Sequence, residues 1–79
     1  MISLREVGEI LHIAKSGRVI VKLNQKLNSG EILLDSKGRK VARVVELIGP
    51  VKAPYASAIP ITDRIKKYVG GKVYKGGRR

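Results

Sequence analysis

The chain has 79 residues, 43% of them hydrophobic, a size and composition that suit one small domain with its own core. It contains no cysteine, which excludes a disulfide framework and any thiolate metal site. Its formal net charge of +11 favours a polyanionic partner, and nucleic acid is the foremost candidate.

The positive charge is concentrated near the carboxyl end. Residues 64–79 hold seven Lys or Arg and no acid, whereas residues 1–63 hold ten Lys or Arg and all six Asp and Glu. Such a run is typical of an interaction arm, although a solvated end that only maintains solubility is the alternative. As RNA-proximal basic residues we expect Arg64, Lys66, Lys67, Lys72, Lys75, Arg78 and Arg79.

No targeting or membrane signal is visible. Residues 1–6 lack a basic region followed by an apolar run, and no apolar run approaches the roughly 18 residues of a membrane span. We therefore expect a soluble, cytoplasmic protein with no membrane partner.

The first elements in chain order form a predicted hairpin. Residues 7–14 predict a strand with apolar side chains on both faces, in which Gly8 marks a β-bulge or a close backbone approach. Residues 18–23 alternate with the period of a half-buried strand. The intervening Lys15-Ser16-Gly17 is a turn signal that joins the two strands.

A second hairpin follows after a polar loop at 24–30. Residues 31–35 predict a short strand, and 36–39 predict a tight turn. Residues 40–48 are rich in β-branched side chains and predict the returning strand.

The segment 48–55 is a proline corner. It contains two of the three prolines, so it has to bend, yet half of its residues are apolar or aromatic. Two interpretations are open: a rigid surface that docks a partner at little cost in entropy, or a structural turn whose apolar residues enter the protein's own core. These eight residues alone favour the structural turn.

The last third predicts three short elements. Residues 55–61 form a strand closed by Pro60, and Thr62 or Asp63 caps one or two helical turns that end at Gly70. Residues 72–74 form a final strand, and residues 75–79 a flexible basic Gly/Arg tail.

About six short strands at regular spacing, with at most one short helix near 63–69, predict an all-β fold. We expect a small closed β-barrel that occupies residues 1–74 as a single domain, because closure removes exposed sheet edges.

Four segments in order, 4–12, 16–21, 38–55 and 69–74, carry a resemblance to a known family. The sequence resembles the glycine-arginine-rich accessory subunit of the H/ACA ribonucleoprotein, the RNA-guided pseudouridylation particle. The most specific element is the Gly-Pro-Val-x-x-Pro-Tyr string at 49–55. The long Gly/Arg arms of the eukaryotic members are absent, so the chain looks like the compact archaeal form, and their nucleolar accumulation is not carried over.

The resemblance implies a six-stranded barrel of the translation-factor type that binds the dyskerin-like catalytic subunit of the pseudouridine synthase. In that family the accessory subunit does not catalyse; it sits near a mobile thumb loop and helps substrate RNA load and product RNA leave during rRNA pseudouridylation in ribosome biogenesis. Guide RNA and substrate rRNA are then indirect partners. The resemblance reverses the preference at the corner in favour of docking, with the contact residues Ile48, Gly49, Pro50, Val51, Pro54 and Tyr55.

The residue inventory argues against catalysis. His12, the single histidine, lies three residues after Glu9, and on an ideal strand those two side chains point to opposite faces, so an acid–base pair would need a bulge. His12 is therefore interpreted as a structural residue. The carboxylates lack the spacing of a metal or two-carboxylate site, and residues 69–72 lack the Walker pattern. We expect no enzymatic activity, metal, cofactor or small-molecule ligand.

A stand-alone basic β-barrel RNA-binding protein of the ribosome or of translation is the alternative function. Its basic residues would neutralise phosphates. The only rings are Tyr55, Tyr68 and Tyr74, and we expect the last two in the core, which argues against base reading by stacking.

Overall fold

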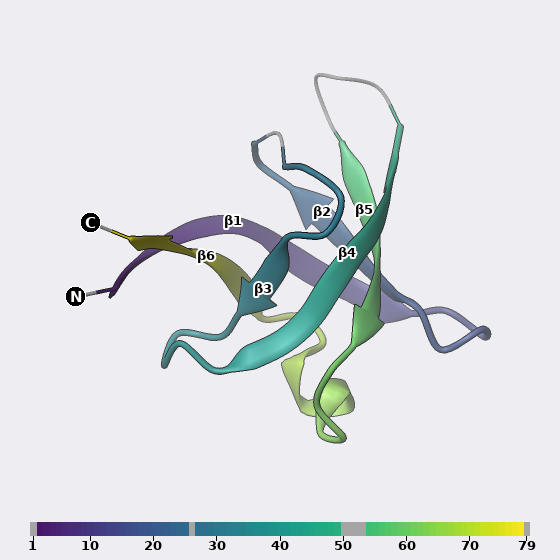
Figure 1. Cartoon of the computed structure of the whole chain (residues 1–79). Helices are drawn as coiled ribbons and strands as arrows, with labels where there is room; N and C mark the ends of the chain where they lie inside the picture. The colour runs from purple at the N-terminus through teal and green to yellow at the C-terminus, as the bar shows by residue number, and fades with distance from the viewer. Residues whose placement is uncertain (1, 26, 50–53, 79) are drawn as a thin grey trace.

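A computed structural model describes residues 2–25, 27–49 and 54–78 and shows six strands and one short 3-10 turn (Figure 1). In chain order they are β1 (Ile2–Ile13), β2 (Val19–Leu23), β3 (Ile32–Leu34), β4 (Lys40–Ile48), β5 (Tyr55–Pro60), η1 (Ile65–Tyr68) and β6 (Lys72–Arg78).

The strands close into an antiparallel barrel in the order β1-β2-β5-β4-β3-β6. The expected all-β, six-stranded closed barrel is thus confirmed, and η1 is the single short helical element expected near 63–69. Within the described ranges, no helix has the length and apolar character needed to cross a membrane.

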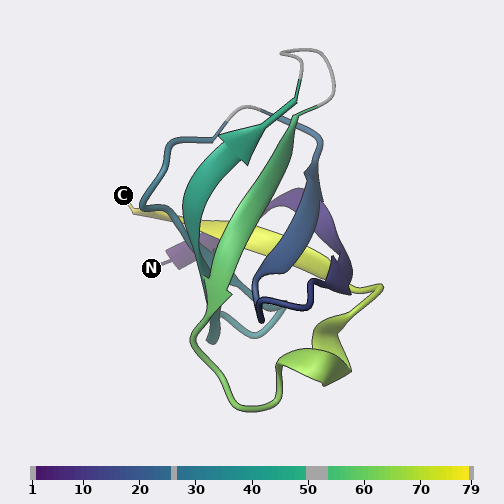
Figure 2. The same ribbon diagram turned by 90° about the vertical axis from the view of Figure 1, so that its right-hand side faces the viewer.

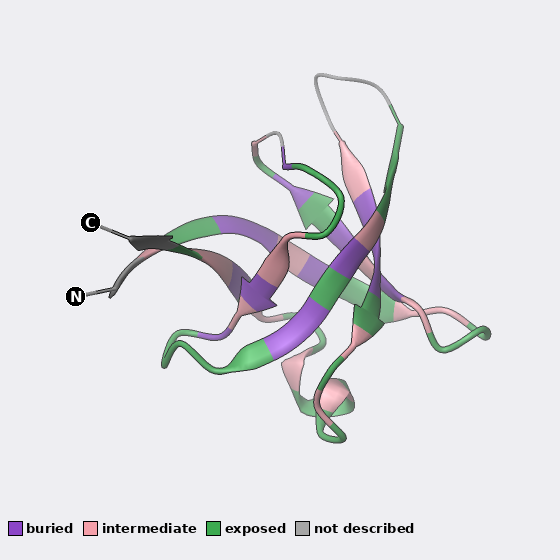
Figure 3. Ribbon diagram, in the orientation of Figure 1, coloured by how far each residue is buried: buried purple, intermediate pink, exposed green. Residues whose placement is uncertain are grey.

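The core consists of aliphatic side chains that point into the barrel, seen as the buried bands along the strands in Figure 3. On β2 the predicted alternation is confirmed, since Val19, Val21 and Leu23 are buried and the residues between them are not. Ile10 and Leu33 are the largest fully buried side chains, and Ile65 and Tyr68 of η1 pack against the cluster from outside.

Successive connections of an antiparallel barrel alternate between its two ends. The β2–β3 and β4–β5 connections lie at the end that we call the upper end (Figure 1). The β1–β2, β3–β4 and β5–β6 connections, the last containing η1, lie at the lower end. The described residues of the proline corner, 48–49 and 54–55, and η1 therefore lie at opposite ends of a molecule that measures 36 × 30 × 20 Å.

Gly8 confirms the predicted bulge and the predicted close approach. The pairing of β1 with β6 shifts register between Glu6 and Gly8, which leaves Val7 as the additional residue. A Cβ atom at Gly8 would collide with the backbone carbonyl oxygen of Lys22 on the neighbouring strand. Only glycine lets β1 and β2 approach so closely.

The outer boundaries of the first and last strands differ from the sequence-based expectations. β1 begins at Ile2 rather than at residue 7, and β6 continues to Arg78 rather than ending at 74. Residues 75–78 are therefore paired strand and not a flexible tail, because each finds a partner among residues 2–5 of β1; Arg79 lies outside the described residues. The end of the chain belongs to the barrel.

The expected side-chain cap of the short helix is also wrong. η1 is preceded by Arg64 and has no capping hydrogen bond from a side chain. The Thr62 hydroxyl instead accepts the backbone N–H of Arg64 at 3.2 Å, which forms a local turn before the helix begins. Ile61 and Val69, on either side of η1, are exposed.

Candidate partner-docking site

The described residues of the proline corner lie where β4 ends and β5 begins, at the upper end of the barrel, and are called the β4–β5 tip (Figure 2). Its last cross-strand pair is Ile48 with Tyr55. Ile48 is 45% exposed and Tyr55 is half-buried. At this pair β5 lies between two strands, because Tyr55 is also paired with Lys22 of β2.

The backbone at both ends of the corner is fixed. Gly49 has φ of +92°, a conformation that disfavours residues with a Cβ, so the chain leaves β4 at a set angle. On the returning side, the Leu23 N–H donates to the Pro54 carbonyl at 3.0 Å, which ties the start of β5 to the end of β2. The two described ends of the corner are therefore fixed relative to the barrel.

Four of the six expected docking residues come together here: Ile48, Gly49, Pro54 and Tyr55. Pro50 and Val51 lie outside the described residues. Pro54 is half-buried, like Tyr55, so neither residue enters the core completely. The four described positions thus present a partly apolar tip.

Leu47 is a further apolar residue of the tip that sequence reasoning missed. A register shift between Val44 and Glu46 leaves Val45 as an extra residue, after which Leu47 pairs with the fully buried Ala56. Cross-strand partners share a face, so Leu47 continues the inward face of the barrel. It nevertheless remains 40% exposed. The pairing of β4 with β3 reaches only to Arg43, so Leu47 lies beyond it on that side of β4. The alternation of residues gave no sign of this bulge.

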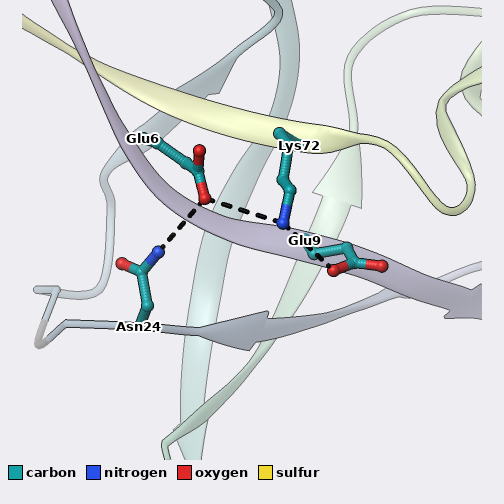
Figure 4. Close-up of polar contacts among 4 residues, drawn as sticks. All are labelled: Glu6, Glu9, Asn24 and Lys72. Carbon is teal, nitrogen blue, oxygen red and sulfur yellow. Dashed lines mark hydrogen bonds and ion pairs between the residues drawn. The ribbon is translucent and has the colours of Figure 1, made fainter.

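Two of the expected RNA-proximal cations are engaged within the protein. Lys72 Nζ lies 3.7 Å from a Glu6 oxygen and 3.4 Å from a Glu9 oxygen, and Asn24 also contacts Glu6 (Figure 4). Lys75 Nζ lies 3.4 Å from a Glu31 oxygen. These ion pairs reduce the charge that the two lysines offer to a phosphate.

The remaining expected cations do not form one patch. Arg64, Lys66 and Lys67 are exposed on and beside η1 at the lower end. β6 leads away from that end, so Arg78 at its far end is remote from η1, and Arg79 lies outside the described residues. Cations that are close in the sequence therefore lie in different parts of the barrel, because β6 leads away from η1.

His12 and Glu9 occupy the same face, contrary to the argument from an ideal strand. The pairing of β1 with β2 shifts register between Ile10 and His12. His12 is then opposite Ile20 and Glu9 opposite Lys22, two positions that share a face of β2. The Glu9 carboxylate is nevertheless directed to Lys72, and His12 is exposed. In the described ranges, no group of three His, Asp or Glu side chains is placed to hold a metal ion.

Asp35 is the one buried carboxylate among the described residues, and it joins two connections at the lower end. Its Oδ1 accepts the N–H groups of Lys37 and Arg39, each at 2.9 Å, and its Oδ2 accepts the Tyr68 hydroxyl at 2.9 Å. Burial by itself raises the pKa of Asp35, but the hydrogen bonds from Arg39, Tyr68 and Lys37 outweigh it and hold that pKa below its usual value. The same bond raises the pKa of Tyr68, with burial adding to the effect.

Comparison with known proteins gives two archaeal relatives. No family model matches the chain. An uncharacterized protein of Methanothermobacter thermautotrophicus is 26% identical over 77 residues, which cover 92% of this chain and 84% of the relative. An uncharacterized protein of Methanocaldococcus jannaschii is 33% identical over 66 residues, which cover 84% of this chain and 78% of the relative. This chain belongs to the family of the Methanocaldococcus protein.

The family relationship extends across the barrel. An alignment that covers 84% of this chain takes in most of the six strands, so the family shares a whole domain and not an isolated motif. In this chain, large aliphatic side chains are exposed at both ends of the barrel, Leu47 and Ile48 above and Ile61 and Val69 below, and exposed cations flank Asp35 and η1 at the lower end.

Proposed function

We propose that the chain is the non-catalytic accessory subunit of an archaeal H/ACA pseudouridylation particle and docks on the catalytic subunit of the pseudouridine synthase through the β4–β5 tip. The proposal combines the sequence resemblance centred on 49–55 with the observation that the described part of the same segment is a held, partly exposed apolar tip. That exposure is the observation on which the proposal depends.

The exposed side chains favour docking over the structural-turn interpretation. A turn that served only the protein's own core would bury its large aliphatic residues, yet Leu47 and Ile48 keep 40% and 45% of their surface exposed. Aliphatic and aromatic anchors at the centre of an interface contribute most of the binding energy in many complexes. The Leu23 to Pro54 backbone hydrogen bond already orders the start of β5, which lowers the entropy that this side of the tip loses on binding.

The proposed role is in the binding and release of RNA and not in the catalytic step. Docked beside the catalytic domain, the barrel promotes loading of substrate RNA and release of product RNA. We expect the synthase without this subunit to retain a single round of pseudouridine formation and to lose rate under multiple turnover. Loss of the first round would instead assign a chemical role to the chain.

The docking proposal is tested by Ile48→Asp, with Ile59→Asp as the matched control. Ile48 and Ile59 are the same residue type with 45% and 46% exposure, but Ile59 lies on β5 opposite Arg43, away from the tip. We expect Ile48→Asp to weaken binding to the synthase subunit at least tenfold, because an interface anchor is worth roughly 2 kcal/mol or more. The measurement is co-purification with the tagged subunit, followed by titration calorimetry.

Both variants should melt at the wild-type temperature, since neither residue is buried. Binding that is unchanged in Ile48→Asp, or weakened equally by both substitutions, would remove the tip as the docking surface.

A further inference from the structure

The lower end of the barrel gathers cations from two connections that are distant in sequence. All six side chains are exposed, three around the β3–β4 turn and three on or beside η1. We call this set the basic end; its members are Lys37, Arg39, Lys40, Arg64, Lys66 and Lys67.

The Tyr68 to Asp35 hydrogen bond fixes one half of the basic end against the other. Tyr68 belongs to η1 and Asp35 to the β3–β4 turn, and their oxygens are 2.9 Å apart. Asp35 also accepts two N–H groups of its own turn, and the residue is buried. The other acid in these connections is the exposed Asp63, and the net charge of the end is about +4 when both are counted.

The cations of the basic end differ from those on β6. In the described parts of the chain, the ion pairs are made by Lys72 and Lys75, and no member of the basic end takes part in one. Cations without carboxylate partners can release bound counterions when they meet phosphates, which is the main source of sequence-independent affinity for nucleic acid.

We propose that the basic end is a contact surface for the sugar-phosphate backbone of RNA. The choice of RNA among polyanions rests on the proposed function. The contact is independent of base sequence, because Tyr68, the only aromatic residue of these connections, is half-buried and its hydroxyl is occupied. The surface extends the expected set of η1 cations to the β3–β4 turn, and it excludes Lys72 and Lys75.

The position of the basic end allows RNA and synthase to bind together. Figures 1 and 2 show η1 at one end of the barrel and the β4–β5 tip at the other. A synthase that covers the tip leaves the basic end open, so the barrel can bridge the catalytic subunit and the phosphate backbone of an RNA in the particle.

The test compares two triple variants with the same change in charge. The first replaces Lys37, Lys66 and Lys67 with Gln, leaving Arg39 and Arg64 beside the Asp35 to Tyr68 pair. The control replaces Arg5, Lys22 and Arg43 with Gln, three exposed cations on β1, β2 and β4. Binding of the full chain to a fluorescein-labelled single-stranded RNA of about 20 nucleotides is measured by anisotropy between 50 and 200 mM KCl.

We expect the first triple variant to bind the RNA about tenfold more weakly. The slope of log binding constant against log salt concentration should become smaller in magnitude by about 2, since each phosphate contact with a single strand contributes about 0.7. The control should lose less than threefold. Equal losses would overturn the proposal, because net charge and not a surface would then govern binding. Undiminished binding by the first triple would overturn it as well.

Synthase binding separates this inference from the proposed function. We expect the first triple to co-purify with the catalytic subunit as the wild type does. Loss of co-purification would overturn the basic end as an RNA surface and make it a protein contact. Suppose that Ile48→Asp leaves synthase binding unchanged while the first triple variant binds RNA more weakly. The docking proposal then fails and the RNA surface stands, as in the stand-alone RNA-binding alternative.

Discussion

Asp35 has a structural role that its place in a turn does not reveal. The carboxylate is buried, and it orders the β3–β4 turn through two N–H groups while it holds η1 through Tyr68. A buried ion without such partners would be strongly destabilising, but three hydrogen bonds satisfy this one. The ionised carboxylate of Asp35 therefore stabilises the fold at the lower end.

The lowered pKa of Asp35 predicts a loss of stability in acid. A carboxyl group whose pKa is lower in the folded state contributes stability above its unfolded pKa, and this contribution is lost as the pH falls through the folded pKa. For Asp35 the decline begins as the pH approaches the ordinary value of 3.8 and continues below it. We expect Asp35→Asn to lower the free energy of unfolding by about 2 kcal/mol at pH 7. The free energy of unfolding of this variant should also decrease less than that of the wild type as the pH falls through this acidic range.

Urea unfolding at several pH values between 7 and 2 measures the effect. Asp63→Asn, which changes an exposed carboxylate next to η1, is the control and should behave like the wild type. Parallel pH profiles for the wild type and Asp35→Asn would contradict the assignment.

At the scale of elements, the long pairing of β1 with β6 accounts for both ends of the chain. Ile2 pairs with Arg78 and Arg5 with Lys75, and the Lys75 to Glu31 ion pair adds a contact to the segment before β3. Residues 75–78 thus contribute to stability. Weaker RNA binding after their deletion could therefore result from partial unfolding and not from the lost charges.

Removal of residues 75–79 should therefore destabilise the barrel. Four cross-strand pairs and one ion pair are lost, and at about 0.2–1 kcal/mol per pair the expected cost is roughly 1–5 kcal/mol. Thermal unfolding followed by circular dichroism measures it. As a control, the double substitution Arg78→Gln with Arg79→Gln keeps the β6 backbone and should leave the melting temperature unchanged. An unaltered melting temperature in the truncated chain would show that the pairing adds no stability.

At the scale of the whole molecule, barrel closure separates the two candidate surfaces. Leu34 of β3 pairs with Tyr74 of β6, which completes the ring of strands and leaves the β4–β5 tip above and the basic end below. Sites that share no contacts and lie at opposite ends of a rigid domain are expected to act independently.

We therefore expect additive behaviour when Ile48→Asp is combined with the triple Gln substitution of Lys37, Lys66 and Lys67. The loss of synthase binding should equal that of Ile48→Asp alone and the loss of RNA binding that of the triple alone, each within about 0.5 kcal/mol. Titrations of the combined variant against each partner provide the measurement. A larger departure would mean that the two ends are coupled through the barrel.

Local patterns were sufficient for most of the elements. The strand predicted at 40–48 has the bounds of β4, and the Ser-Gly and Lys-Gly turns correctly placed the two hairpins. Gly8 indicated an irregular position in the strand, because glycine inside a strand often marks a bulge or a close backbone approach, and both occur here. Leu47 was not recognisable, because a bulge at Val45 depends on the partner strand.

The amino-acid sequence by itself determined the strands, their turns, the apolar character of the corner and the total charge, since propensity, alternation and composition are properties of neighbouring residues. The tertiary structure alone decided that residues 75–78 join β1, that Lys72 and Lys75 meet carboxylates, and that Asp35 binds Tyr68. Each of these depends on groups far apart in the chain, and only closure of the barrel brings them within contact distance.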